Sequence, residues 1–169
     1  MFWLRLHLRI AYSTEIGAAT AYRGHAAATR EPVVAALVRS IEQDERHHRA
    51  ELGELLERYD ARPFVWLDHL YTFIGTCVGW GCHFWGPWAS AFGAAQFEFG
   101  GIADYRRAAR AARAIGNPDL VAKLESFQAQ EAAHRAFFLD LARATFPIPW
   151  VQRRPLDMKL HPLVRAQGG

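Results

Sequence analysis

The residues of this chain that could carry out chemistry form one pattern that occurs twice: a lone glutamate followed by Glu-x-x-His. The motif follows its lone glutamate after 30 residues in the first copy and after 33 in the second. The six residues are Glu15, Glu45, His48, Glu98, Glu131 and His134. Carboxylates with one imidazole for each metal ion suit iron or manganese better than zinc or copper. The pattern therefore predicts a site for two divalent cations.

The six residues fall on helix faces that are otherwise apolar. Glu45 and His48, for example, lie between Ile41 and Leu52 at steps of four, three and four residues, which places them on one face. A single buried glutamate is more often satisfied by a neighbouring arginine or tyrosine. Four carboxylates in one core would each cost several kcal/mol unless cations neutralise them. The burial pattern therefore favours the metal site.

The two metal ions are expected to share their ligands in a defined way. In the usual arrangement, Glu15 and Glu98 are terminal ligands, Glu45 and Glu131 bridge the ions, and one histidine binds each ion. Neighbouring side chains should hold these ligands by hydrogen bonds. The candidates for this role are Asp44, Asp104 and Tyr105, of which the last two are also the candidate catalytic residues.

A second acidic-x-x-His spacing, formed by Asp44 and His47, competes with the first one. The helix face that it would use also carries Ser40, Glu51 and Glu54. Such a face is solvated, so we expect it to lie outside the core.

Four helical tracts must position the six residues, and we expect an all-α protein. Short turns join the first tract to the second and the third to the fourth, so each pair should form an antiparallel hairpin. The lone glutamate and the Glu-x-x-His of each copy then lie at equal distances from their turn. Two hairpins joined by a long crossover are the ferritin-like form of the four-helix bundle. The tracts are about 4–27, 30–58, 87–115 and 118–145, and the crossover is 59–86.

The crossover contains the most apolar part of the chain. Residues 70–97 include no Asp, Glu, Lys or Arg, and they exceed the roughly 20 residues that span a bilayer. Five glycines and Pro87 should break this run as a continuous helix. Its tryptophans stand in the middle, whereas spanning helices keep them at their ends. We expect a segment that dips into one leaflet, with a buried core segment or a true span as the alternatives.

Composition limits the remaining possibilities. A chain of 169 residues suits one domain, and two cysteines cannot form a zinc ribbon. No phosphate-binding glycine loop occurs, and no nucleic-acid partner is expected. Residues 1–149, the bundle, carry equal numbers of acidic and basic side chains, so the net charge of +3 lies in a basic tail, 150–169. This tail could contact anionic lipid.

The start of the chain, Met1-Phe-Trp-Leu-Arg, leads directly into the helix that carries Glu15. We therefore expect no cleavable presequence. The expected location is the cytoplasmic face of a bacterial inner membrane, with peripheral or monotopic attachment.

With these features, the sequence resembles the demethoxyubiquinone monooxygenase family of ubiquinone biosynthesis, within the ferritin-like di-iron superfamily. The glycine-rich crossover is similar to that family's membrane-facing segment, and the resemblance extends over residues 9–143. It rests on Glu15-Ile-Gly-Ala, Tyr22-Arg-Gly, Asp44-Glu45-Arg-His-His48, Glu98 with Ile102 and Tyr105, and Glu131-Ala-Ala-His134.

The resemblance implies an O2-dependent monooxygenase with two iron ions, or manganese as the alternative, that hydroxylates a lipophilic polyprenyl quinol. The substrate would come from the membrane, and an external reductant would supply electrons. Two positions depart from the family pattern. Phe99 replaces a second acidic residue, and Asp104 replaces a histidine implicated in electron delivery. The reductant and the exact quinol therefore stay open, as does the choice between a homo-oligomer and a partner from quinone biosynthesis.

Three other functions fit parts of the pattern. Bacterioferritin also carries two such glutamate and histidine sets, although a storage shell needs no apolar crossover. A rubrerythrin-type peroxidase would carry a four-cysteine module that this chain does not contain. A non-catalytic membrane factor could keep the metal site for stability alone.

Overall fold

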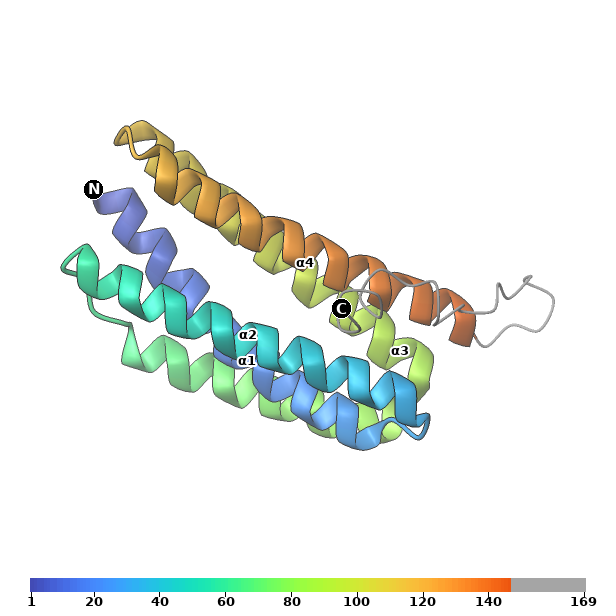
Figure 1. Cartoon of the computed structure of the whole chain (residues 1–169). Helices are drawn as coiled ribbons and strands as arrows, with labels where there is room; N and C mark the ends of the chain where they lie inside the picture. Colours follow the sequence, from blue (N-terminus) through green and yellow to red (C-terminus); the bar gives the residue numbers. More distant parts are fainter. Residues whose placement is uncertain (147–169) are drawn as a thin grey trace.

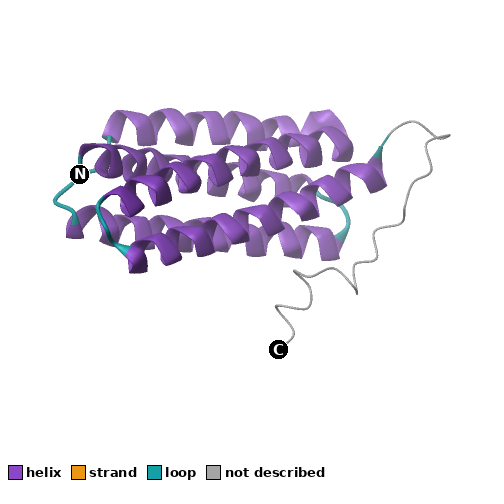
Figure 2. Cartoon of the chain, turned by 90° about the horizontal axis from the view of Figure 1, so that it is seen from above, coloured by secondary structure: helices purple, strands orange, loops and turns teal. Residues whose placement is uncertain are grey.

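The computed structural model describes residues 1–146, and over that range the protein is helical without a strand (Figures 1 and 2). The arrangement is compatible with the predicted four-helix bundle. The basic tail, 150–169, lies outside the described residues. The helices are α1 (Phe2–Ala28), α2 (Pro32–Arg58), α3 (Val65–Ala114) and α4 (Pro118–Thr145).

The turns between paired helices are short and carry clear capping signals. At the start of α2, the Glu31 side chain accepts a hydrogen bond of 2.6 Å from the Val34 amide. At the start of α4, the Asn117 side chain accepts a hydrogen bond of 3.0 Å from the Leu120 amide. Gly116, which precedes Asn117, adopts a positive φ of 72°. The predicted end of one helix and start of the next around Gly116 are confirmed. Glycine suits this turn because it adopts a positive φ at low cost.

The structure corrects the prediction for residues 59–86. These residues were expected to form a broken, membrane-dipping crossover, but α3 already begins at Val65 and runs to Ala114 with one non-helical residue, Gly86. Gly86 has φ 77° and precedes Pro87, and at this point the chain turns back on itself (Figure 1). The crossover is therefore a helical segment, 65–85, and the second segment, 87–114, belongs to the bundle.

Two glycines of the helical crossover, Gly75 and Gly79, allow close packing against α1. A side chain on Gly75 would collide with the backbone of Gly17, and one on Gly24 would collide with the backbone of Gly79. Each glycine thus faces another glycine across the contact. The sequence pattern that indicated helix breaking instead reflects a backbone approach that no larger residue permits.

The outer side of α3 exposes many large apolar side chains, and we call these residues the apolar face. It consists of Trp66, Leu70, Phe73, Ile74, Trp80, Phe84, Trp85, Phe92 and Phe99. Within residues 1–146, no helix combines the length and the apolar character needed to cross a membrane.

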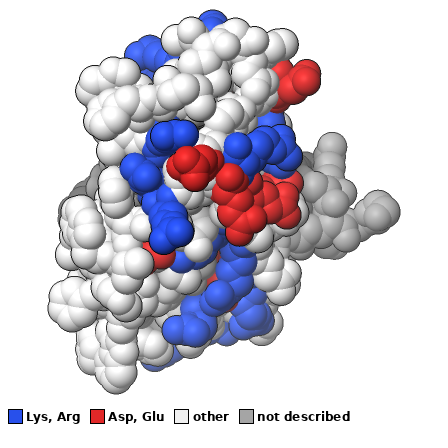
Figure 3. Space-filling model, turned by 90° about the vertical axis from the view of Figure 1, so that its left-hand side faces the viewer, with Lys and Arg blue, Asp and Glu red and all other residues white. Residues whose placement is uncertain are grey.

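One end of the bundle differs from the apolar face, because basic and acidic side chains adjoin there (Figure 3). This end holds the start of α1 and the turn between α3 and α4 (Figure 1). Arg5 lies 3.8 Å from Asp60, and Arg113 lies 2.6 Å from Glu125. Charged side chains therefore pair with one another at this end of the bundle.

Candidate metal centre

The structure brings the six predicted residues together in the middle of the bundle. Glu15 comes from α1, Glu98 from α3, and the two Glu-x-x-His motifs from α2 and α4, so each hairpin supplies one complete copy of the pattern. All six side chains are 3% exposed or less. This placement follows from the apolar stripes of the four helices, which pack inward and carry the polar residues with them.

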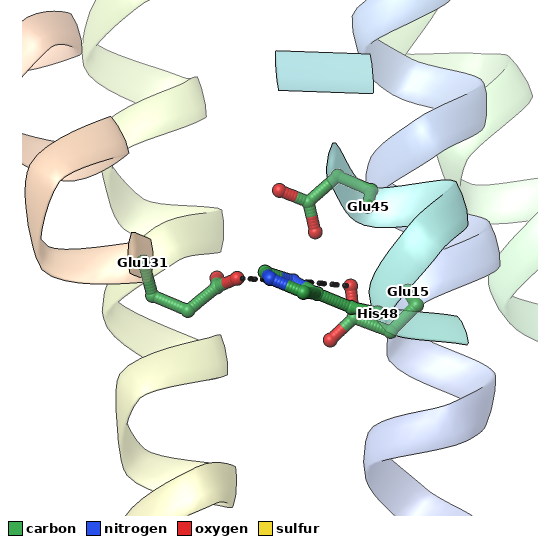
Figure 4. Close-up of side chains that lie close together, drawn as sticks. All are labelled: Glu15, Glu45, His48 and Glu131. Atoms are coloured by element: carbon green, nitrogen blue, oxygen red, sulfur yellow. Dashed lines mark ion pairs between the residues drawn. The ribbon is translucent and has the colours of Figure 1, made fainter. Parts of the chain in front are cut away.

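The six residues divide into two groups that share two glutamates. Within each group, the atoms that could bind a metal ion lie within 4.8 Å of one another. The first group is Glu15, Glu45, His48 and Glu131, and the second is Glu45, Glu98, Glu131 and His134. Figure 4 shows the first group, with His48 between Glu15 and Glu131. Glu45 and Glu131 thus occupy the position expected of bridging ligands, and the metal-binding role of all six residues stays a prediction.

Each histidine directs its Nδ1 atom toward the carboxylates. His48 Nδ1 lies 3.1 Å from Glu131 Oε1 and 4.0 Å from Glu15 Oε2. His134 Nδ1 lies 3.2 Å from Glu45 Oε1 and 3.8 Å from Glu98 Oε2. In both cases the nearest carboxylate belongs to the opposite hairpin, so the cluster ties the two hairpins together.

Two buried tyrosines hold the two lone glutamates. The Tyr105 hydroxyl donates a hydrogen bond of 2.5 Å to Glu15, and the Tyr22 hydroxyl donates one of 2.5 Å to Glu98. Tyr105 was a predicted candidate, whereas Tyr22 was not assigned a role in the site. A signal for Tyr22 existed, because it follows Glu15 by seven residues, as Tyr105 follows Glu98.

The outer nitrogen of each histidine also has a partner. His134 Nε2 lies 3.2 Å from Asp44 Oδ2, and His48 Nε2 lies 2.8 Å from Gln130 Oε1. Asp44 was among the predicted candidates, but Gln130 was not. Asp104 has another partner, because its carboxylate accepts a hydrogen bond of 2.7 Å from Arg107 while it lines the cavity beside the cluster.

Burial makes the cluster costly in its metal-free form. It raises the pKa of Glu15 to about 7 and raises the pKa values of Glu45 and Glu98 well above the usual range, with neighbouring carboxylates adding to the shift for the last two. For His48, burial lowers the pKa, but the adjacent Glu131 and Glu15 carboxylates outweigh burial and raise it to about 9. Without cations, the carboxyl groups of Glu15, Glu45 and Glu98 therefore cannot all stay ionised near neutral pH.

The donor atoms fit two divalent cations. Several buried atoms of the cluster make no hydrogen bond within the described part of the chain: Glu15 Oε2, Glu45 Oε1, Glu131 Oε1, His48 Nδ1 and His134 Nδ1. Such atoms are rare in protein interiors because each loses its water without compensation. Two divalent cations would use these lone pairs and balance four carboxylate charges.

A cavity of about 510 Å³ opens beside the cluster, between α1 and α3. Gly93 and Gly100 face open space, whereas a side chain on Gly101 would collide with the Glu131 carboxylate. The lining consists of the four glutamates with Thr14, Ala18, Tyr22, Tyr71, Gly93, Gln96, Phe97, Gly100, Gly101 and Asp104. The glycines on this side of α3 therefore leave room for a ligand next to the carboxylates.

Comparison with known protein families gives a match over most of the chain. The family model described as ubiquinone biosynthesis protein COQ7 matches residues 3–136, which is most of the chain and includes all six residues of the cluster. No curated protein and no solved structure matches the sequence.

Proposed function

Because this chain belongs to the family of ubiquinone biosynthesis protein COQ7, we propose that it is an O2-dependent di-iron monooxygenase that hydroxylates a demethoxyubiquinol-like quinol. The observation that carries this proposal is the buried cluster of four glutamates and two histidines, with unpartnered donor atoms, next to a cavity. The family membership supplies the biosynthetic role, and the cluster supports the oxygen chemistry.

Two bound iron ions would supply the activation of O2 and the transfer of one oxygen atom to the quinol ring. The residues of the chain hold and orient these ions. Glu45 and Glu131 lie in both groups and would contact both ions, whereas Glu15 and Glu98 would each contact one. Tyr105 and Tyr22 fix the two lone carboxylates by hydrogen bonds, so the ligands are oriented before a metal ion binds.

The cavity suits the head group of the substrate. Its volume of about 510 Å³ falls within the usual range for small-molecule sites. Ala18 and Phe97 offer apolar contacts, while Gly93 and Gly100 leave space for a planar ring against α3. A ring in this position would lie beside the carboxylates, with Tyr71 of the crossover segment also lining the cavity.

The apolar face supports peripheral attachment to a membrane. A polyprenyl quinol resides in the bilayer, and Phe92 and Phe99 continue the apolar face along the helix that lines the cavity. We propose attachment at the cytoplasmic face of a bacterial inner membrane, with the basic tail, 150–169, as a second contact. Alternatively, a second copy of the chain or a partner from quinone biosynthesis would cover the apolar face. This face also favours a hydroxylase over an iron-storage shell, which has no need of it.

The decisive experiment supplies the iron-loaded, anaerobically reduced protein with O2 and a soluble demethoxyubiquinol analogue. We expect a product that is heavier by one oxygen atom, detected by mass spectrometry. The Glu131→Ala variant, treated in the same way, should form none. Consumption of O2 without that product would overturn the proposal, and assembly into a closed multi-subunit cage would favour iron storage.

A further inference from the structure

The metal centre has an internal two-fold relation that exchanges the two hairpins. Each cluster residue of the first hairpin, and the tyrosine seven residues after its lone glutamate, has a counterpart in the second hairpin. The pairs are Glu15 with Glu98, Tyr22 with Tyr105, Glu45 with Glu131, and His48 with His134. The relation extends to the contacts, because each tyrosine donates a hydrogen bond of 2.5 Å to the lone glutamate of the opposite hairpin.

This relation fails at one pair of positions. The residue before each bridging glutamate contacts the outer nitrogen of the opposite histidine, but it is an aspartate in α2 and a glutamine in α4. Asp44 Oδ2 lies 3.2 Å from His134 Nε2, and Gln130 Oε1 lies 2.8 Å from His48 Nε2. Both partners offer an oxygen as acceptor, so each histidine can keep a proton on Nε2 and offer the Nδ1 lone pair to a metal ion in the cluster.

The chemical difference between the two partners is charge. A carboxylate that accepts the outer N–H of an imidazole makes the inner nitrogen a stronger metal donor, and it adds a negative charge near the cation. The amide of Gln130 orients its ring without adding charge. The distance from Gln130 to His48 is shorter than that from Asp44 to His134 by a few tenths of an ångström. Hydrogen bonds to an ionised acceptor, however, are roughly twice as strong as neutral ones. Charge therefore outweighs distance here.

We propose that the two metal positions bind with unequal affinity: the position served by His134 and Asp44 fills first, and the position served by His48 and Gln130 fills second. This inference rests on the proposed dinuclear site. Asp44 and Gln130 act as positioning residues, because each works through a histidine. Loss of such a partner costs about 10–100-fold in metal affinity. The Asp44 side chain is 44% exposed, so solvent screens its charge and we expect a value near tenfold.

Substitution at these positions should leave the fold intact. Asp44 is half-buried and Gln130 is exposed, so neither fills the core. Asp44→Asn removes the charge while keeping the size, and Gln130→Glu adds a charge at the counterpart position. The two changes are matched, because each makes the partners of the two histidines alike. The double variant exchanges their chemistry.

The test is an anaerobic titration of the metal-free full chain with ferrous iron. The first equivalent is 57Fe and the second is ordinary iron, and Mössbauer spectroscopy reads where the first ion binds. In the unsubstituted protein we expect the two binding steps to differ in affinity by about tenfold, so the 57Fe should favour one of two quadrupole doublets by about three to one. Either single variant should give two doublets of equal area and a single binding step, and the double variant should make the other doublet the larger one.

Two other results would contradict the account, and they can be told apart. Two equal steps in the unsubstituted protein, or an order that neither variant changes, would overturn the inference and leave the dinuclear site standing. A chain that holds fewer than two iron ions would overturn the proposed function and the inference with it. Far-ultraviolet circular dichroism of each variant confirms that the helices are retained.

Discussion

At the centre of the bundle, four carboxyl groups are withdrawn from water, whereas along the outside of α3 large aromatic side chains are left in it. Glu45 and Glu98 are 1% exposed, and Phe84 is 79% exposed. Each region is costly for an isolated chain. Burial of an ionised carboxylate costs several kcal/mol, and exposed apolar surface costs about 25 cal/mol for each Å².

The two regions differ in how narrowly they define a partner. The cluster presents six side chains in two groups, and the donor atoms of each group lie within 4.8 Å of one another, so it would select cations by charge and geometry. The apolar face is spread over many side chains on both segments of α3, and it selects only for an apolar surface. A single substitution should therefore abolish function in the cluster but only weaken it on the apolar face.

The largest effect is expected for Glu131→Ala. Glu131 belongs to both groups, so its loss should remove a ligand from both metal positions. The fold should also lose the stability that metal binding gives it. We expect iron content to fall from two ions per chain to less than one. Glu125→Ala, on the exposed surface of the same helix, is the control and should keep both ions. Equal iron content in the two variants would contradict the assignment of the site.

The dependence of stability on pH should be opposite with and without metal. The folded-state pKa values of Glu15, about 7, and His48, about 9, exceed their ordinary values of 4.5 and 6.5, so both groups stabilise the metal-free fold at low pH. That stability is lost as pH rises through about 7 and then about 9. The loss should be on the order of 3 kcal/mol between pH 5 and pH 8, because each unit of pKa is worth about 1.4 kcal/mol.

Thermal denaturation of the metal-free and iron-loaded protein across this pH range tests the prediction. The iron-loaded protein should instead gain stability toward pH 8, because metal ions compete with protons for the same ligands. His25 acts in the opposite direction, since burial lowers its pKa from 6.5 to about 4 and its contribution is lost as pH falls from about 6.5 to about 4. A metal-free protein that is more stable at pH 8 than at pH 5 would contradict the burial of unneutralised carboxyl groups.

A smaller effect is expected for Tyr105→Phe and Tyr22→Phe. Each change removes the hydroxyl that donates to a buried glutamate and should lower the free energy of unfolding by about 1–3 kcal/mol. Because the two contacts are counterparts, the two losses should be similar. Tyr12→Phe, which keeps the ring that Arg49 packs against, serves as control in urea denaturation. If the two variants lost clearly different amounts of unfolding free energy, the two hydrogen bonds would not be energetically equivalent.

The smallest effect is expected on the apolar face. Trp80→Ser and Phe84→Ser each remove an exposed aromatic ring, and each should weaken binding to anionic lipid vesicles by at most about 1.5–3 kcal/mol, the value for complete burial of such a side chain. Phe2→Ser is a matched control, because Phe2 is also exposed but lies on α1 at the charged end of the bundle. Co-sedimentation provides the measurement. Equal binding by all three variants would place the membrane contact elsewhere.

The inward-facing placement of the cluster residues could be predicted because it depends on local helix periodicity. The spacing of Glu45 and His48 with Ile41 and Leu52 places all four on one helix face, whatever that face packs against. Gly116 and Asn117 similarly indicate the end of one helix and the start of the next without reference to the rest of the chain. These features follow from helix geometry alone.

The features that sequence reasoning missed depend on distant partners. Gly75 and Gly79 resemble helix breakers until Gly17 and Gly24 are seen opposite them, where they allow two helices to touch. Gln130 similarly gains a role only because His48, far away in the sequence, lies 2.8 Å from it. Comparison of the two copies of the pattern could have found Gln130, because it precedes Glu131 as Asp44 precedes Glu45.

The central claim is that the buried cluster holds two metal ions, and metal analysis of the full chain tests it most directly. The protein is loaded with ferrous iron under anaerobic conditions, freed of loosely bound metal, and measured for iron per chain beside the Glu45→Ala/Glu131→Ala double variant. The account predicts two ions in the unsubstituted protein and none in the variant. Fewer than two ions in the unsubstituted protein, or the same content in both proteins, would contradict it.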